Sequence, residues 1–470
     1  MPNLKNSKNQ RLSSLIIAES LVISYILYLA FYVVQLADPF APNFVLVYLP
    51  FLSLFAFLII MCSLAVGLYE PKLRETFRGI IRRIFVAHGL AFFAMVVISS
   101  VFFRDIFIHQ YYFVVSICLT ITCISFFRYF VIKFGALGLV KSRIVVLGAG
   151  ERAAIIEQKM RRASDRKGFE LLGFIPVPGD DVENGIQHEP LLNINIDDSF
   201  KSFILENDID EVVVAADQRR GTLPIEVLFD CRLQGTSITD LLDFMERETG
   251  QIVVNLMYPS WLIYSKGFIS QNYVRQLGDF GLNLFLATLV LIFVWPFMLL
   301  TALVIYMDDG RKTGASIFYK QTRVGKDGVP FSIYKFRSMG IDAEKNGAQW
   351  ADKNDVRVTR VGGFIRKYRL DELPQLYNIF RGDMSFVGPR PERPEFVEKL
   401  VKEVPFYNQR QNVKPGLAGW AQLNYPYGAS VEDAMEKLKY DLYYVKHQSF
   451  LLDILVLVRT VEVVLFGKGQ

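Results

Sequence analysis

The sequence predicts three kinds of structure in one chain: an α-helical membrane bundle, an α/β Rossmann-like domain, and a mainly α-helical domain attached to the membrane. Three observations predict this fold class. Of the 470 residues, 52% are hydrophobic and the mean hydropathy is +0.27, values too apolar for an ordinary cytosolic protein. A short apolar strand, a glycine turn and a helix follow one another within residues 142–160. After residue 274, a long apolar segment leads into an arginine-rich stretch with Gly/Pro turns.

Four apolar runs open the chain, and each reaches the roughly 20 residues that a helix needs to cross a bilayer. Lys and Arg precede the first run, lie between the second and third, and follow the fourth. The link after the first run has neither, and the link after the third has only Arg104. The positive-inside rule therefore predicts that both ends of this bundle are cytoplasmic. The runs are residues 12–36, 45–68, 84–103 and 112–134.

The first run contains one ionisable side chain, that of Glu19. An ionisable group inside a membrane helix either takes part in function or pairs with an opposite charge. We expect the second, a pair with a basic residue near the cytoplasmic face. The run is too long for a removable signal peptide and lacks a small-residue cleavage site, so we expect it to be a retained anchor.

The cysteines and histidines argue against a soft-metal centre. Cys62, Cys118 and Cys123 fall in apolar runs and Cys231 stands alone, so we interpret them as small hydrophobic residues. The four histidines are scattered, without the paired spacing of a zinc site. Neither a zinc site nor a disulfide framework is therefore expected.

A fifth apolar run, residues 280–307, is long enough to cross a bilayer, which would export everything after it. Two features oppose crossing. Both flanks are basic, with Arg275 before the run and Arg311 and Lys312 after it. Pro296 lies just past the middle, where it removes a backbone donor and favours a bend. From local sequence alone, a re-entrant helix and a proline-kinked transmembrane helix both remain open.

From residue 142 the pattern becomes that of a soluble α/β domain. KSRIVVL is typical of a buried strand, DEVVVAAD and QIVVNLMYP of further strands, and PIEVLFDCRLQG of a helix. Gly148, Gly150 and Ala153 form a G-x-G-x-x-A turn that could aim amides at a pyrophosphate. Glu151, however, places an anion where the phosphate would sit, and no convincing ribose-binding acid ends the second strand. We therefore favour a scaffold, regulatory or dimerisation module over a cofactor site.

Three sequence blocks follow the fifth run. They are GASIFYKQTRVGKDGVPFSIYKFRSM, VTRVGGFIRKYRLDELPQLYNIFRGDMSFVGPRPERPEF and VKPGLAGWAQLNYPYG. In this order they resemble the bacterial sugar transferases, the monotopic polyprenyl-phosphate phosphoglycosyl transferases. The resemblance covers roughly residue 274 to the C-terminus, and the bundle with its Rossmann-like unit resembles the N-terminal half of the large members of that family.

The resemblance implies an enzyme that moves a sugar-1-phosphate from a UDP-sugar to undecaprenyl phosphate, the first membrane step of exopolysaccharide or O-antigen assembly. It implies that Asp371 is the nucleophile, forming a phosphosugar-enzyme and releasing UMP. It also implies that Glu372 assists, with both carboxylates at a Mg²⁺ ion. Carboxylate nucleophiles and hard cations suit this chemistry. An Asp-Glu pair taken alone is more ordinarily a solvated helix start.

Cationic and amide side chains around this pair are the expected substrate-binding residues. Guanidinium groups bind phosphate oxygens through two parallel hydrogen bonds, and prolines fix the loop that presents them. An alternative for part of the set is attraction to anionic lipid headgroups. The expected set is Gln321, Arg323, Arg337, Arg360, Arg366, Arg369, Arg390, Pro391 and Gln422.

UDP-sugars are cytoplasmic, so the resemblance favours re-entry of the fifth run in a multi-pass protein of the bacterial inner membrane, with its catalytic domain on the cytoplasmic face. The expected partners are the UDP-sugar, undecaprenyl phosphate and the bilayer, with a possible homodimer and no nucleic acid. The apolar run 449–466 is expected in the headgroup plane or, alternatively, in the core. The expected domains are a four-helix transmembrane bundle (1–138), a Rossmann-like cytoplasmic domain (139–260), a linker (261–279), a re-entrant membrane helix (280–307) and a sugar transferase catalytic domain (308–470).

Two rival functions remain. A membrane nucleotide-sugar dehydratase has a similar N-terminal half, but nothing after residue 274 offers a second G-x-x-G-x-x-G turn or a Tyr-x-x-x-Lys pair. A non-enzymatic scaffold for polysaccharide assembly would have a degenerate catalytic half, and the intact pair Asp371 and Glu372 with its arginines opposes that interpretation.

Overall fold

The computed structural model divides the chain into two compact units, Met1–Phe244 and Met245–Gln470. Within them it describes residues 15–29, 32, 49–69, 77–102, 110–133, 142–161, 165–166, 168–218, 222–257, 261, 265, 267–268, 273–343, 345, 357–426, 428 and 430–465.

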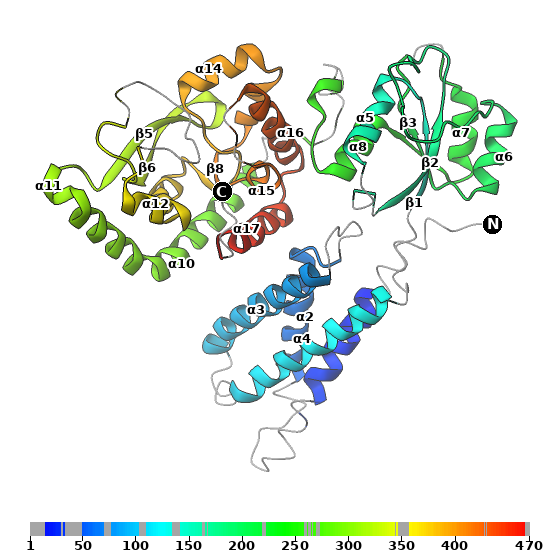
Figure 1. Ribbon diagram of the computed structural model, residues 1–470. Helices are drawn as coiled ribbons and strands as arrows, with labels where there is room; N and C mark the ends of the chain where they lie inside the picture. Colours follow the sequence, from blue (N-terminus) through cyan, green and yellow to red (C-terminus); the bar gives the residue numbers. More distant parts are fainter. Residues whose placement is uncertain are drawn as a thin grey trace. The chain divides into compact units, whose positions relative to one another are not determined.

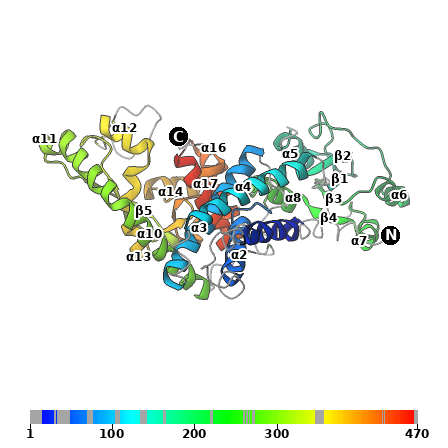
Figure 2. The same cartoon turned by 90° about the horizontal axis from the view of Figure 1, so that it is seen from below.

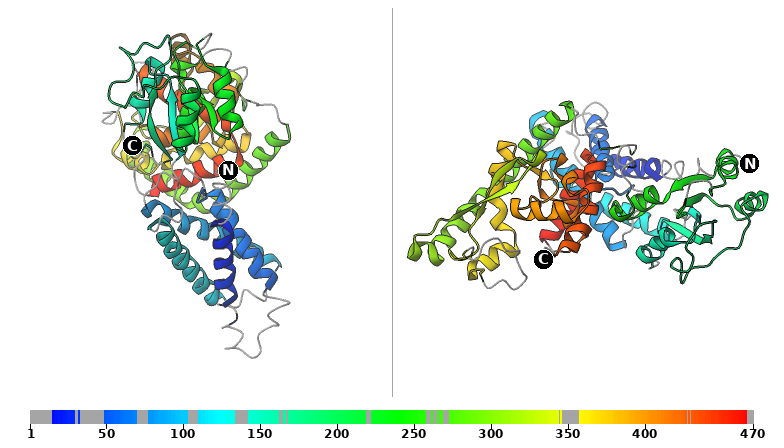
Figure 3. Two further views of the ribbon diagram at one scale, coloured as in Figure 1. Left: turned by 90° about the vertical axis from the view of Figure 1, so that its right-hand side faces the viewer. Right: turned by 90° about the horizontal axis from the view of Figure 1, so that it is seen from above.

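The first unit begins with apolar helices that lie side by side (Figure 3). They are Leu15–Leu29, α2 (Leu49–Ala65), α3 (Phe77–Phe102) and α4 (Gln110–Lys133), so a helix falls in each of the first four apolar runs. Among the described helices, only segments Gly79–Val96 and Gln276–Asp308 are long and apolar enough to cross a membrane. The prediction of four membrane spans therefore stays a prediction.

Glu19 has the basic partner that the sequence led us to expect. It is 1% exposed and makes two hydrogen bonds with Arg128 of α4, from Nε to Oε1 at 2.6 Å and from Nη2 to Oε2 at 2.9 Å. The remaining terminal nitrogen of Arg128 donates to the Leu68 carbonyl at 2.8 Å, after α2 ends. This bidentate, hydrogen-bonded geometry is what makes a buried ion pair tolerable in an apolar bundle.

The α/β domain has the predicted parallel sheet, in the order β2-β1-β3-β4. Helices cover both faces of the sheet, with α5 on one side and α6 and α7 on the other (Figures 1 and 2). The elements are β1 (Ser142–Leu147), α5 (Glu151–Lys159), β2 (Phe169–Ile175), α6 (Asp198–Glu206), β3 (Glu211–Val214), α7 (Ile225–Leu233), β4 (Ser237–Asp240) and α8 (Leu241–Thr249).

One core of this domain lies between the sheet and helices α6 and α7. Val145 and Val212, from the central strands, pack with Phe200 of α6 and with Leu228 and Cys231 of α7, and all five side chains are buried. Continuous burial of the central strands is typical of a parallel sheet covered on both faces. Cys231 is thus a small core residue, as the sequence predicted.

The prediction that QIVVNLMYP forms a strand is wrong. Residues Val254–Leu256 form a short 3₁₀ helix, and the segment packs on the C-terminal domain instead of extending the parallel sheet. The Ile252 amide donates to the Lys439 carbonyl at 2.9 Å, and Trp420 Nε1 donates to the Gly250 carbonyl at 2.8 Å. A short apolar run does not distinguish a strand from another buried segment, and here tertiary contacts decide.

The second unit is built around the long helix α10 (Tyr273–Ile305), which begins earlier than the expected 280 and contains Pro296. Figure 1 shows that α10 changes direction along its length, a shape that an internal proline explains. The elements that follow are η4 (Tyr306–Gly310), α11 (Arg311–Thr313), β5 (Phe318–Val324), β6 (Pro330–Phe336), α12 (Arg360–Lys367), η6 (Leu370–Gln375), α13 (Leu376–Arg381), β7 (Ser385–Val387), α14 (Pro394–Glu403), η7 (Tyr407–Asn412), β8 (Gly416–Ala418), α15 (Trp420–Asn424), α16 (Val431–His447) and α17 (Phe450–Leu465).

Helix α10 packs on the same domain on both sides of Pro296. Ala287, before the proline, is buried in a cluster with Leu376 and Ile379 of α13. Ile305, at the end, is buried with Phe336 of β6 and Ile365 of α12. The opposite side of the helix exposes large apolar side chains, a surface of a size that marks contact with a membrane or a partner. They include Phe285, Ile292, Phe293, Trp295, Phe297, Leu299, Leu300 and Leu303.

The C-terminal helix α17 belongs to the core of this domain, the alternative that the sequence left open. Val456 is 0% exposed and clusters with Tyr444 of α16 and Val387 of β7. Asp453, one of the few polar residues of the run, accepts a hydrogen bond from the Tyr444 hydroxyl at 2.8 Å. The polar interruptions of this apolar helix thus serve its packing at least in part.

Candidate functional site

The Asp371–Glu372 pair lies on the short 3₁₀ helix η6, directly after α12. Thr359 caps the start of α12 by accepting from the Gly362 amide, and Gly362 has no room for a side chain, because a Cβ there would lie 1.9 Å from the Ser338 carbonyl oxygen. Arg369 then turns the chain with a left-handed φ of 53°, a conformation that non-glycine residues rarely adopt. This turn replaces a continuous α-helix and directs both carboxylates inward, where they are 8% and 7% exposed.

Glu372 is held by three cations. Its Oε1 lies 2.8 Å from Arg390 Nη2 and 3.3 Å from Lys335 Nζ, and its Oε2 lies 3.5 Å from Arg369 Nη1. Burial raises the pKa of Glu372, but the charges of Arg390, Lys335 and Arg369 outweigh it and hold this pKa far below its ordinary value. Glu372 is therefore ionised throughout the physiological pH range.

Asp371 is in a different position, although it is the next residue. Among the described residues, no cation lies within ion-pair distance of its carboxylate and no side chain donates a hydrogen bond to it. Burial, and then the neighbouring charge of Glu372, raise its pKa to about 6, against the opposing pull of Lys335 and Arg390. At pH 7 roughly nine in ten copies of this side chain are ionised. The site thus presents one buried carboxylate, Asp371, that has no ion-pair partner among the described residues.

Lys335 lies at this site, and the sequence analysis did not name it. Its side chain is 17% exposed, and burial lowers its pKa while Glu372 supports its charge. Strand alternation could have found it, because Lys335 shares a face of β6 with Ile333, which is 3% exposed. A lysine on the apolar face of a strand needs a buried anion, and Glu372 supplies one.

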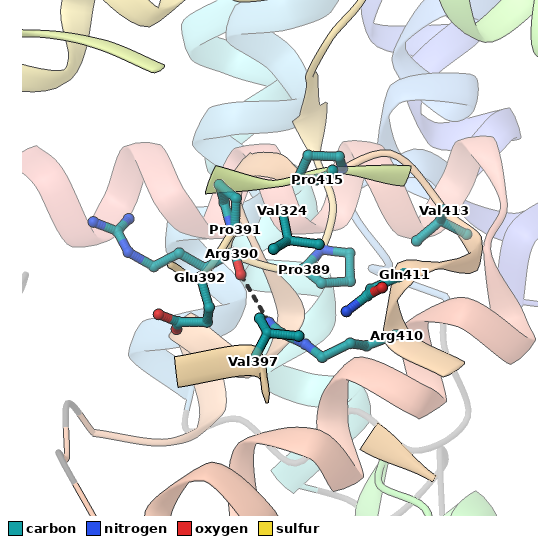
Figure 4. Close-up of a pocket in the computed structure, with 11 residues that line it drawn as sticks. Val324, Pro389, Arg390, Pro391, Glu392, Val397, Arg410, Gln411, Val413 and Pro415 are labelled. Carbon is teal, nitrogen blue, oxygen red and sulfur yellow. Dashed lines mark hydrogen bonds between the residues drawn. The ribbon is translucent and has the colours of Figure 1, made fainter. Parts of the chain in front are cut away.

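The loop that carries Arg390 is fixed from behind by a second buried ion pair. Arg410 is 9% exposed and binds Asp441 of α16, with Nη2 at 2.8 Å and Nε at 3.0 Å from Oδ2. The Nη2 group of Arg410 also donates to the Arg390 carbonyl at 2.8 Å, and Nη1 donates to the Tyr407 hydroxyl. Figure 4 shows the hydrogen bond from Arg410 to the Arg390 carbonyl. The sequence analysis named neither Arg410 nor Asp441, since their pairing joins segments distant in the chain.

The cavity behind this loop is too small for a substrate. Its volume is about 20 Å³, room for a single water molecule. It is lined by Val324, Gly325, Pro389, Arg390, Pro391, Glu392, Val397, Arg410, Gln411, Val413 and Pro415, and not by Asp371 or Glu372 (Figure 4). This small cavity is therefore a packing gap behind the loop and not a substrate site.

Part of the predicted substrate set gathers at this loop. Arg323 donates to the Gln321 side chain at 2.6 Å and to the Pro391 carbonyl at 3.3 Å. Burial lowers the pKa of Arg323, and Glu392, 3.6 Å away, opposes that shift. Strand β5 thereby joins two of the predicted residues, Gln321 and Arg323, to the turn that carries two others, Arg390 and Pro391.

The other predicted residues differ in their relation to the pair. Arg366, on α12, is near enough to lower the pKa of Asp371. Arg360 is exposed at the start of the same helix. Arg337 follows β6, where its amide donates to the Ile317 carbonyl. Gln422 lies on α15, and its Oε1 would be 3.3 Å from a Cβ on Gly419. Among the described residues, no hydrogen bond or ion pair joins Arg360, Arg337 or Gln422 to Asp371 or Glu372. The substrate-binding assignment stays a prediction for all nine residues of the expected set.

Metal ligands at this site would be hard oxygen donors. The described residues contain no group of three or more His, Cys, Asp or Glu side chains able to hold a metal ion. Two adjacent carboxylates are, however, the protein share that Mg²⁺ commonly takes when substrate phosphates and water complete its shell. The donor set therefore fits magnesium with a phosphorylated substrate and does not fit zinc.

Comparison with known proteins gives two family matches. Residues 274–467 match the family described as bacterial sugar transferase, and residues 64–220 match a family described as CoA-binding domain. The first match contains the Asp371–Glu372 pair, and the second contains most of the α/β domain.

Three relatives illustrate the similarity. A UDP-N-acetylgalactosamine-undecaprenyl-phosphate N-acetylgalactosaminephosphotransferase of Aeromonas hydrophila is 37% identical over 259 residues, 54% of this chain and 59% of the relative. A UDP-glucose:undecaprenyl-phosphate glucose-1-phosphate transferase of Xanthomonas campestris pv. campestris is 30% identical, over 70% of this chain and 68% of the relative. A UDP-galactose-lipid carrier transferase of Erwinia amylovora is 29% identical, over 70% and 69%. The chain thus spans less than two thirds of the length of the Aeromonas relative.

The unequal environments of the two carboxylates predict one that titrates near neutral pH. Infrared spectra should be recorded from about pH 4.5 to about pH 8, a range that brackets the pKa of Asp371. They should show a carboxylic acid C=O band that disappears as one group loses its proton near pH 6. The spectra of Asp371→Asn should lack this band. Because Lys335 lowers the pKa of Asp371, Lys335→Met should move this transition to higher pH. A transition that persists in Asp371→Asn would assign it to another residue.

Proposed function

Because this chain belongs to the bacterial sugar transferase family, we propose that it transfers a sugar-1-phosphate from a UDP-sugar to undecaprenyl phosphate and releases UMP. The observation that carries the proposal is the buried pair in which cations hold Glu372 while Asp371 has no ion-pair partner in the part of the chain that the structure describes. Relatives named for this type of transfer to undecaprenyl phosphate support the choice of donor and acceptor.

We propose that Asp371 is the nucleophile. Its carboxylate oxygen attacks the β-phosphorus of the UDP-sugar, the bond from that phosphorus to the bridging oxygen breaks, and UMP leaves. A phosphate oxygen of undecaprenyl phosphate then attacks the same phosphorus, which frees Asp371 and forms the diphosphate-linked sugar. Two displacements divide one transfer into two easier steps. The pKa of Asp371, about 6, leaves the carboxylate ionised at pH 7 while burial keeps it poorly solvated and reactive.

The surrounding residues have separate roles in this scheme. Glu372 orients Arg390 and Lys335 and keeps them beside the nucleophile. These cations reduce the repulsion between an anionic nucleophile and an anionic diphosphate and stabilise charge on the departing phosphate oxygens. Asp371 and Glu372 would also hold Mg²⁺, which supplies a Lewis acid for the diphosphate when bound.

We propose that α10 re-enters the membrane, so that the catalytic domain lies on the cytoplasmic face, where UDP-sugars are. The packing of both Ala287 and Ile305 on one domain supports re-entry, since a crossing helix would carry its end away from that domain. The apolar helices of the first unit would supply four membrane spans of a multi-pass protein of the bacterial inner membrane.

A homodimer through the α/β domain is part of the proposal. Ile225, Phe229 and Leu233, four residues apart on α7, are 74%, 58% and 71% exposed, and such a stripe is typical of a face that packs on a partner. Sedimentation of the purified protein should show a dimer that Leu233→Glu weakens. A wild-type monomer at micromolar concentration would refute it.

Substitution of the nucleophile tests the reaction. Asp371→Asn should lower UMP release from a UDP-sugar by at least about a thousandfold, because an amide is not a competent nucleophile. Asp342→Asn, at a carboxylate that is 70% exposed, is the matched control and should leave release unchanged. Mass spectrometry of enzyme quenched during turnover should find the phosphosugar adduct on Asp371. Retained turnover in Asp371→Asn would remove this residue from the mechanism.

Cysteine labelling tests re-entry. In a cysteine-free background, Gln276→Cys and Thr313→Cys, exposed positions on either side of the apolar part of α10, should react with a membrane-impermeant maleimide in inside-out vesicles and not in spheroplasts. Asp38→Cys, in a link expected on the opposite side and outside the described residues, should show the reverse. Labelling of either flank in spheroplasts would show that α10 crosses the membrane.

A further inference from the structure

The α/β domain has a topological switch point between β1 and β3. The chain leaves β1 through α5 to β2 on one side, and β3 pairs with β1 on the other side. In open parallel sheets, ligands bind in the crevice at the carboxyl ends of the strands at such a point. Here the crevice would lie between the turn that begins at Gly148 and the segment that follows Val214.

The two backbones that should border this crevice are in contact. A Cβ on Gly148, whose φ is +123°, would lie 2.6 Å from the carbonyl carbon of Ala215 and 2.6 Å from the amide nitrogen of Ala216. Both distances are shorter than any real side-chain contact, so glycine is required because the segment after β3 lies against this turn. The turn and the segment after β3 are therefore in direct backbone contact at Gly148.

The anion position at the start of α5 is filled by Asp217. Its Oδ1 accepts from the Arg152 amide at 2.9 Å, and its Oδ2 accepts from the amides of Glu151 at 3.1 Å and Asp181 at 3.2 Å. A Cβ on Gly150 would lie 1.8 Å from Asp217 Oδ2. The first amides of a helix that follows a glycine turn are the ones that otherwise bind a phosphate. The glycine that would admit a pyrophosphate here admits a carboxylate of the same chain.

A second carboxylate, that of Asp180, binds further backbone amides around the glycine turn. Asp180 Oδ2 accepts from the amides of Ala149 and Val177, both at 2.9 Å, and its Oδ1 accepts from the Asp217 amide at 3.0 Å. The two aspartates therefore tie together the segments that follow β1, β2 and β3. They use the amides of residues 149, 151 and 152, which a pyrophosphate would need.

The residues of this site do not fit the group that the matched family description names. A diphosphate would have to displace two carboxylates that together accept six backbone hydrogen bonds, and it would meet their negative charge as it approached. We propose that the α/β domain binds neither CoA nor a dinucleotide at its glycine turn, because Asp217 and Asp180 fill the anion site and convert a nucleotide-binding frame into a structural module. This conclusion is independent of the chemistry at Asp371.

The test uses the full-length protein in detergent, with CoA, NAD⁺ and inorganic phosphate as probes. Wild type should show no saturable binding of CoA or NAD⁺ by calorimetry at concentrations up to about 1 mM, and phosphate should leave its Tm unchanged. Asp217→Ser vacates the anion position and should lower the Tm, because three amides lose their acceptor. Phosphate should then raise the Tm of this variant and restore part of the loss.

Asp197→Ser is the matched control. Asp197 caps α6 by accepting from the Ser199 amide at 2.7 Å, so the same substitution is made at another aspartate that binds a helix amide, away from the glycine turn. Because serine can also cap a helix, the Tm of this variant should change little, and it should not respond to phosphate. If the serine variant does not fold, Asp217→Ala, which also vacates the anion position, replaces it with the same expected response, and the binding measurement on the wild type remains a separate test.

Two results would overturn the proposal. One is saturable binding of CoA or NAD⁺ by the wild type below about 1 mM. The other is a phosphate response of the Asp217 variants no larger than that of Asp197→Ser. Neither result depends on sugar transfer, so the transferase assignment can fail while this proposal stands, and the reverse.

Discussion

The ion cluster around Glu372 is the interaction on which the catalytic domain depends. Two neighbouring carboxylates are buried, and burial of an uncompensated charge costs more than a folded domain can usually supply. At an effective dielectric constant of about 20, two unit charges about 4 Å apart interact by about 4 kcal/mol, so Arg390, Lys335 and Arg369 can offset the burial of one carboxylate. They do so for Glu372, because its oxygens receive them directly. Asp371 shares the field of these cations without their contacts, and that difference separates the pKa values of two adjacent residues.

Elements far from the pair set the positions of these cations. Lys335 comes from β6, which the side chain of Asn378 fastens to α13, accepting from the Tyr334 amide and donating to the Ser332 carbonyl. Arg390 comes from a loop whose carbonyl is held by Arg410, itself anchored on α16. Helix α10 packs in two hydrophobic clusters of this domain. This long apolar helix is thus part of the scaffold of the candidate site, and its bend at a proline lets one helix contact two parts of the same domain.

The sequence predicted what depends on local motifs and missed what depends on pairing across the chain. The Asp371–Glu372 pair, the glycine turn and the parallel strands β1 and β3 follow from short patterns, and the structure contains them. Arg410 was missed because its partner Asp441 lies 31 residues away, and Lys335 because a lysine in a strand is ordinarily solvated. The segment after Gly250 was assigned as a strand because its apolar pattern fits any buried chain, and its docking on Trp420 and Lys439 is not written in that pattern.

Two pairs of carboxylates in this protein differ in the hydrogen-bond donors placed around them. Asp180 and Asp217 each accept three backbone hydrogen bonds, so displacing either one costs the satisfaction of several amides. Asp371 is more deeply buried than either aspartate, yet among the described residues it accepts no side-chain hydrogen bond and no ion pair. A carboxylate whose lone pairs are all engaged is a poor nucleophile, whereas one that is buried, ionised and unengaged retains its reactivity. The fold therefore places different donors around the same functional group, which fits a structural role for Asp180 and Asp217 and the proposed nucleophilic role of Asp371.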